Sequence, residues 1–340
     1  MLSSVVWENT PRIARITRIK ALLLKTVPVA TGLVLFGLVF NRLGSENVLH
    51  LLAQSGWGFF GMVLIFALQE MVRAAGVIES LSSFSRPTFK DMLHIRFVGE
   101  GVRALTLTGP FLAEPTRAWF IGKHGVRSHD AAAATIADFV VHSLVSAVFT
   151  ILATYYFIEV VRTPGISRIV ARILLYGSMG YLALASAVWY RRIRVIGPIA
   201  GGLACLPGLR NLLCGRVEGV RRTEETLHTV LRDRPRTLVT LVLLQFLSHL
   251  LLFLEAYWGI VSMGIDVSFL TAALSEVLTK VANIALFGAS EGAYAVMFAA
   301  LGLPGAVGFA LSVLKRARSL AVAGIGMGSL ALLSLRQTRV

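Results

Sequence analysis

Long apolar runs separated by clusters of arginine and lysine constrain this chain more than any other feature of its sequence. A helix of about 20 apolar residues crosses a bilayer, and runs of about that length or longer cover residues 21–40, 57–78, 131–158, 168–190, 238–263 and 306–335. Charged residues make up only 15% of the chain, against about 25% in a soluble domain. The runs do not alternate with polar residues, which excludes a β-barrel. We therefore predict an all-α polytopic protein with about six transmembrane helices, in a single membrane domain over residues 1–340.

The basic residues orient these helices. Arginines and lysines gather before residue 21, in the loop 191–236 and at the C-terminal end, whereas the loop 302–305 carries no charge. The positive-inside rule then places both termini and the loop 191–236 in the cytoplasm, as expected of a multi-pass protein of the cytoplasmic (inner) membrane. The formal net charge of +15 comes mostly from such loops. No nucleic-acid-binding motif accompanies it, so we expect no nucleic-acid partner.

Two apolar segments are too interrupted and too charged to be simple spans. The segment 92–123 contains Glu100, Arg103, Glu114 and Arg117 around a Gly109-Pro110 break, with a second proline at 115. Proline removes an amide donor and interrupts a helix, and broken backbone within a membrane survives only against protein or a wet cavity. We predict a re-entrant pair of half-helices over 92–123, and a second pair over 269–301.

These two segments also correspond to one another. An offset of 177 positions places Glu114 on Glu291 and Arg103 on Lys280. Interrupted segments in corresponding halves are the best sequence indication of a transporter site. We therefore predict an inverted repeat, with repeat 1 over about 21–190 and repeat 2 over about 237–335, whose re-entrant pairs open to opposite sides of the membrane.

The loop 191–236 has its own pattern. Leucines and valines from Leu209 to Leu231 recur at roughly the helical period, with arginines between them. This pattern predicts a cytoplasmic amphipathic helix that rests on anionic headgroups. A solvated connector is the alternative.

Several short motifs together resemble a known family. Glu114-x-x-Arg117 follows a glycine/proline break, and the second half contains Gly288-x-x-Glu291, Leu301-Gly302-Leu303-Pro304, and Arg316 followed by Gly324 and Gly326. These residues resemble the lysylphosphatidylglycerol synthase transmembrane, or flippase-like, family of integral membrane proteins. The resemblance covers roughly residue 92 to the C-terminus. It implies a lipid-translocating membrane domain, which in some members is fused to a soluble aminoacyl-transferase domain. The chain has no room for such a domain after its last span, so we expect no aminoacyl-transferase activity.

Charged side chains within the membrane segments are the candidate substrate-binding residues, because an intramembrane charge is costly and usually functional. Arginine offers a bidentate fork to a phosphate, and the glutamates would hold these cations or exchange protons. The principal candidates are Arg103, Glu114, Arg117, Lys280, Glu291 and Arg316, and the secondary ones are Glu100, Asp138, His142, Glu276 and Asn283. For Asp138, His142, His249 and Glu255 we expect hydrogen bonds between helices rather than a metal site. We expect no catalytic residue, metal or cofactor.

These residues favour one function over two others. We expect a flippase- or scramblase-like protein that moves an anionic or phosphate-bearing lipid through a charged midplane cavity, with membrane lipids as its partners. One alternative is an intramembrane serine hydrolase that uses Ser290, in a Gly-x-Ser-x-Gly pattern, with His142 or His249; that pattern normally requires a preceding strand. The other is a structural membrane protein without transport. The lipid, the coupling and the oligomeric state stay open.

Overall fold

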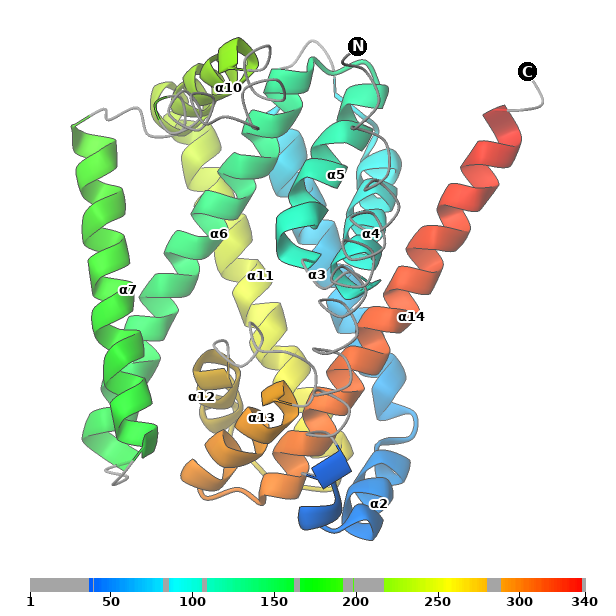
Figure 1. The fold of residues 1–340 in the computed structure, drawn as a ribbon, viewed down its shortest axis with the longest axis vertical. Coiled ribbons are helices and arrows are strands. Elements are labelled where there is room, and N and C mark those ends of the chain that lie inside the picture. Colours follow the sequence, from blue (N-terminus) through cyan, green and yellow to red (C-terminus); the bar gives the residue numbers. More distant parts are fainter. Residues whose placement is uncertain are drawn as a thin grey trace, which may run out of the picture. The chain divides into compact units, whose positions relative to one another are not determined.

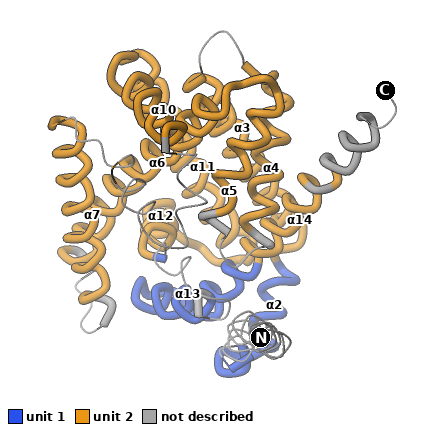
Figure 2. The backbone as a smooth tube through the Cα atoms, turned by 45° about the horizontal axis from the view of Figure 1, so that its top comes forward, with its two compact units in different colours: residues 1–54, 279–313 blue, residues 55–278, 314–340 orange. Residues whose placement is uncertain are grey.

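A computed structural model describes residues 37–38, 40–81, 86–105, 109–161, 166–191, 198, 217–279 and 289–337. Helices make up nearly all of this part of the chain, and no strand occurs in it (Figure 1). The all-α prediction is confirmed. Figure 2 shows that the chain divides into two compact units. Unit 1 comprises residues 1–54 and 279–313, and unit 2 comprises residues 55–278 and 314–340.

Four helices are long and apolar enough to cross a membrane. They are α3 (Gly58–Ser80), α6 (Ser128–Tyr156), α7 (Ile166–Tyr190) and α11 (Pro235–Ser262). They coincide with four of the six predicted spans. The first predicted span, 21–40, lies mostly outside the described residues. The last becomes α14 (Gly305–Gln337), a helix of 33 residues that is less apolar than these four because it carries Lys315, Arg316 and Arg318.

The segment predicted to be re-entrant forms two short helices, α4 (Phe89–Leu105) and α5 (Gly109–Lys123). They lie side by side and contact one another (Figure 1). Their 17 and 15 residues correspond to roughly 26 and 23 Å of helix, less than the hydrocarbon core of about 30 Å. The structure corrects one detail of the prediction. Pro115 lies inside α5 and does not end it.

The second predicted pair corresponds to α12 (Phe269–Leu278) and α13 (Ala289–Ala300). These helices belong to different units. Within unit 2, α12 packs on α11 and α6 and begins at the end where α11 finishes. The α4–α5 pair instead begins and ends where α3 finishes and α6 starts (Figure 1).

Unit 1 contains α2 (Ser45–Ser55, apart from its last residue), α13 and the first turns of α14. Gly308 permits close contact between α13 and α14, because a Cβ there would lie 2.6 Å from the carbonyl oxygen of Tyr294. The rings of Phe40 and Phe309 have centroids 6.0 Å apart. Aromatic and small residues thus hold the described part of this unit together.

Unit 2 has an apolar core to which α3, α4, α5 and α6 all contribute. Its buried members are Ala74, Val77, Leu81, Met92, Ile95, Ile121, Val126, Ala131 and Ala134. Helix α14 approaches α4 closely at Gly326, where a Cβ would lie 2.5 Å from the carbonyl oxygen of Phe97. The glycine in the family-like motif therefore has a packing role.

Part of the predicted amphipathic segment is helical. Helix α10 (Val217–His228) continues as a π-helical turn, η2 (Thr229–Asp233), and a similar turn, η1 (Phe157–Val161), follows α6. The apolar residues Leu227, Val230 and Leu231 pack against residues of α6 and α11. These three side chains contact protein in place of the predicted headgroup surface. Residues 209–216 lie outside the described residues.

Candidate functional site

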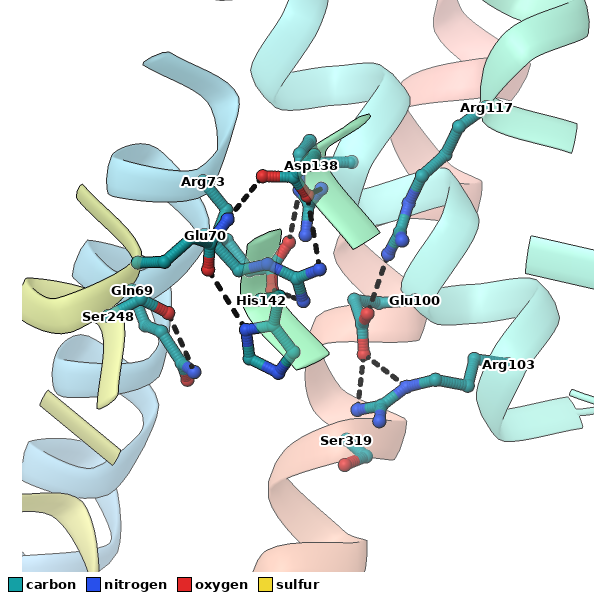
Figure 3. Close-up of polar contacts among 12 residues, drawn as sticks. Gln69, Glu70, Arg73, Glu100, Arg103, Arg117, Asp138, His142, Ser248 and Ser319 are labelled. Carbon is teal, nitrogen blue, oxygen red and sulfur yellow. Dashed lines mark hydrogen bonds and ion pairs between the residues drawn. The ribbon is translucent and has the colours of Figure 1, made fainter. Parts of the chain in front are cut away.

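Two groups of charged side chains lie inside unit 2, and the α4–α5 pair carries the first. We call Glu100, Arg103, Glu114 and Arg117 the hairpin network. Arg117 donates from Nη2 to Glu100 Oε1 at 2.7 Å and also pairs with Glu114. Arg103 Nη2 lies 2.6 Å from Glu100 Oε2 (Figure 3). Glu100 therefore joins the arginines of both helices.

A glycine makes this arrangement possible. A Cβ at Gly99 would lie 2.2 Å from Arg117 Nε, so any other residue on this part of α4 would displace the Arg117 side chain. Each carboxylate–arginine pair within a helix, Glu100 with Arg103 and Glu114 with Arg117, has the i, i+3 spacing at which side chains meet. The contact between Arg117 and Glu100 then depends on close packing of the two helices.

Members of the hairpin network differ in exposure. The side chains of Glu100 and Arg117 are 2% and 3% exposed, whereas Arg103 is 44% and Glu114 20% exposed. Arg103 lies in the last turn of α4, next to the interruption between the two helices. The network thus has a buried centre and an accessible cation at one edge.

The second group joins α3, α4 and α6. We call Glu70, Arg73, Arg96 and Asp138 the interhelix network. Arg96 donates from Nε to Glu70 Oε2 at 2.8 Å and from Nη1 to Asp138 Oδ2 at 3.3 Å. Arg73 Nη2 donates to the same Asp138 oxygen at 3.2 Å (Figure 3). Side-chain exposure is 1% or less for Glu70, Arg96 and Asp138 and 12% for Arg73.

Neutral polar side chains extend the interhelix network to α11. Gln245 donates to Asp138 Oδ1, and its Oε1 lies 2.9 Å from His142 Nδ1. The hydrogen bonds between helices predicted for Asp138 and His142 are therefore confirmed. His249 instead has Nδ1 2.8 Å from the carbonyl oxygen of Gln245 in its own helix, and its ring stacks on that of His142 with centroids 4.5 Å apart.

Each network contains two arginines and two carboxylates. A lone buried charge costs several kcal/mol, and only a partner with good hydrogen bonds offsets this cost. The equal numbers of arginines and carboxylates make both networks formally neutral, so each buried charge has a partner of opposite sign. Arg96 Nη2 and Arg117 Nε are nevertheless buried with no hydrogen-bond partner in the described part of the chain, so each network contains a donor that is not satisfied.

Helix α14 adds two further ion pairs. Lys315 pairs with Glu276 of α12, and Arg318 pairs with Glu255 of α11. Arg318 also lies over the Phe66 ring, 3.8 Å from its centroid, a favourable cation–π geometry. Glu255 makes the contact between helices that the sequence predicts, and its partner Arg318 is not among the candidate site residues.

The structure brings four predicted site residues together, and the other principal candidates lie on other elements or outside the described residues. Glu100, Arg103, Glu114 and Arg117 meet, as described above. Glu291 is buried in unit 1, in the first turn of α13. Arg316 is half-buried on α14, in unit 2. Lys280 and Asn283 lie outside the described residues, as does the side chain of Ser290.

Sequence reasoning missed Arg96. Glu70 and Arg73, one helical turn apart on α3, pair at 3.8 Å, and Arg96 is the buried arginine that joins this pair to Asp138. A signal does exist, because Arg96 lies four residues before Glu100 and so on the same face of α4. A charged residue that shares a helix face with a candidate site residue is therefore a candidate for the same site.

Comparisons with known proteins give one match. A family model described as the lysylphosphatidylglycerol synthase TM region matches residues 24–326. No curated protein and no solved structure matches the chain. The matched region covers most of the chain, including both charged networks.

Proposed function

The chain belongs to the lysylphosphatidylglycerol synthase TM family, and from that premise we propose that it moves an anionic, phosphate-bearing lipid headgroup between the leaflets. The membrane helices and the family match support a membrane protein related to lipid handling. Translocation along the α4–α5 pair is the further step that we propose. The family contains a synthase by name, but no residue of the hairpin network is assigned a catalytic role here.

The exposure of Arg103 carries this proposal. The Arg103 side chain is 44% exposed, whereas that of its partner Glu100 is 2% exposed. The N–H groups of Arg103 that do not bond Glu100 are therefore accessible to a ligand near the end of α4. Arginine binds phosphate oxygens through a bidentate fork. A lipid phosphate that exchanges its hydration shell for such donors can leave the aqueous surface at a lower free-energy cost, while the acyl chains of the lipid stay in the bilayer.

Charge balance suggests how the cycle is coupled. The hairpin network is neutral when empty, so a bound phosphodiester gives it one net negative charge. Uptake of one positive charge together with the headgroup would restore neutrality. We propose that such uptake accompanies headgroup binding.

The inverted repeat is part of the same proposal. Helix α4 ends at Leu105 and α12 at Leu278, while α5 begins at Gly109 and α13 at Ala289. The offset of 177 positions relates the sequences of the two pairs, and we propose that they are corresponding re-entrant pairs. We also propose that both termini face the cytoplasm. Single cysteines at positions 127 and 305 test this topology, which fails if 127 reacts from outside or 305 only from inside.

Translocation is tested with headgroup-labelled phosphatidylglycerol in proteoliposomes. Arg103→Gln should slow translocation about tenfold or more, since a hydrogen bond to a charged group contributes about 1.5–3 kcal/mol. Lys123→Gln is the matched control. It removes one exposed cation from the other end of the α4–α5 pair, where Lys123 stacks on Trp119. Equal rates for wild type, Arg103→Gln and Lys123→Gln, all folded, would contradict the proposed role of Arg103.

The hydrolase alternative stays a prediction. It needs the Ser290 side chain, which lies outside the described residues. Labelling by a fluorophosphonate probe, lost in Ser290→Ala, would support it and would count against a purely translocating protein.

A further inference from the structure

A polar cavity of about 330 Å³ lies in unit 2, apart from both charged networks. It lies where α6 and α11 begin and where α3 ends, and α10 lies beside these ends (Figure 1). Its charged lining residues are Arg127, His129, Asp130, Arg222, Glu225 and Arg234. Neither the hairpin network nor the interhelix network contributes a residue to it.

The cavity has more cations than anions. Asp130 is occupied by two of its neighbours, because its Oδ2 accepts from Arg127 Nε at 2.9 Å and its Oδ1 lies 3.5 Å from His129 Nε2. Glu225 pairs at 3.5 Å with Arg221, which does not line the cavity. Three arginines and two carboxylates line the cavity, which leaves one net positive charge without counting His129.

Two of the three arginines can turn toward a ligand. The Arg222 side chain is 61% exposed and pairs with Glu218 at 3.2 Å, and an exposed pair of this kind is weak. The Arg234 side chain has no ion pair or hydrogen bond among the described residues, and it is half-buried. Neither guanidinium is fixed by a buried partner.

The helix ends add to the positive potential. Arg127 and Arg234 are the residues immediately before α6 and α11, and neither helix start is capped by a side chain. The positive end of each helix dipole and the unbonded N–H groups of the first turn therefore lie at the cavity, although Pro235 at the start of α11 supplies no N–H. The carbonyl end of α3 also lies there, but Arg86 covers it by donating from Nη2 to the carbonyl oxygen of Leu81 at 3.2 Å. A cation before a helix is unfavourable unless an anion accompanies it.

We propose that this cavity binds the phosphate group of an organic phosphate, with Arg222 and Arg234 as its main ligands. A volume of about 330 Å³ lies at the lower end of the range for small-molecule sites, about 300–1,000 Å³. A lipid headgroup at the membrane surface and a water-soluble phosphomonoester share this chemistry. The site does not depend on the proposed translocation.

The test uses the full-length protein and two probes. Glycerol 3-phosphate is titrated by calorimetry into protein in phosphatidylcholine nanodiscs, and phosphatidic acid binding is measured by native mass spectrometry. The variant is Arg222→Gln/Arg234→Gln. Its charge-matched control is Arg232→Gln/Arg236→Gln, two exposed arginines that flank Arg234 in sequence but do not line the cavity.

At least one probe should bind the wild type, and the cavity variant should lose about tenfold or more in affinity. The control should stay within about twofold, since exposed charges contribute little. Binding of glycerol 3-phosphate supports the site with a soluble ligand, and binding of phosphatidic acid alone supports it with a lipid headgroup. Equal losses in both double variants, or no binding of either probe by the wild type, would overturn the proposal.

Discussion

The hairpin and interhelix networks each contain two arginines and two carboxylates, yet their surroundings differ. Glu70, Arg96 and Asp138 are essentially inaccessible and join three helices. The hairpin network joins only α4 and α5, and at its edge Arg103 is 44% exposed. Networks with the same number of arginines and carboxylates therefore differ in burial and in the number of helices that they join.

The difference indicates what each network does. A network that is enclosed by protein is costly to break, and its unsatisfied donors are inaccessible to a ligand. A network with an exposed cation at the end of a helix can exchange one of its ion-pair partners for a ligand. We infer that the interhelix network holds unit 2 together, and that the hairpin network handles the headgroup.

The largest expected effect on stability comes from Arg96→Gln. It leaves Arg73 as the one arginine of this network to pair with the buried Glu70 and Asp138. Breaking a buried ion pair costs about 3–5 kcal/mol. The free energy of unfolding should fall by about that amount, measured as a lower melting temperature of the purified protein in detergent. Arg221→Gln is the control, because Arg221 and Glu225 are 3.5 Å apart and both exposed. The inference fails if Arg96→Gln melts no lower than this control.

A smaller loss is expected for Gly99→Ala. Its Cβ would overlap Arg117 Nε, and overpacking of this kind costs about 1–3 kcal/mol. Gly122→Ala on α5 has no neighbour within 4 Å and should stabilise the helix by up to about 1 kcal/mol. The two alanine variants should thus shift the melting temperature in opposite directions. A shift of the same sign and size would show that Arg117 does not depend on the space at Gly99.

The smallest effect on stability is expected for Arg103→Gln. Arg103 is partly exposed and Glu100 keeps Arg117 as a partner, so the loss should be about 1 kcal/mol or less. Thermal unfolding monitored by tryptophan fluorescence measures it. A loss as large as that of Arg96→Gln would remove the distinction between the two networks.

The sequence predicts the helices well because hydropathy and helix-breaking residues act locally. Four of the predicted spans, the pair α4–α5 and its charged residues all follow from apolar run length, Gly109-Pro110 and the i, i+3 spacing of Glu114 and Arg117. The interfacial helix was less predictable. Its period was correct over α10, but which surface Leu227, Val230 and Leu231 cover depends on tertiary packing.

The networks themselves depend on contacts that spacing does not encode. Arg96 meets Asp138 across 42 positions, and Arg318 meets Glu255 across 63. A single sequence marks each of these residues as an intramembrane charge but does not pair them. The cavity between α6, α10 and α11 likewise exists only once the helices have packed.

The most direct test measures headgroup translocation per folded molecule for two charge-neutral double variants. Glu70→Gln/Arg96→Gln removes one carboxylate and one arginine from the interhelix network, and Glu100→Gln/Arg103→Gln removes one of each from the hairpin network. Rates of labelled phosphatidylglycerol in proteoliposomes are divided by the amount of folded protein. We predict that the first variant melts lower and translocates at the wild-type rate, whereas the second translocates about tenfold more slowly or worse. Equal rates for both variants, or a slower rate for the first, would contradict the assignment of headgroup handling to the hairpin network.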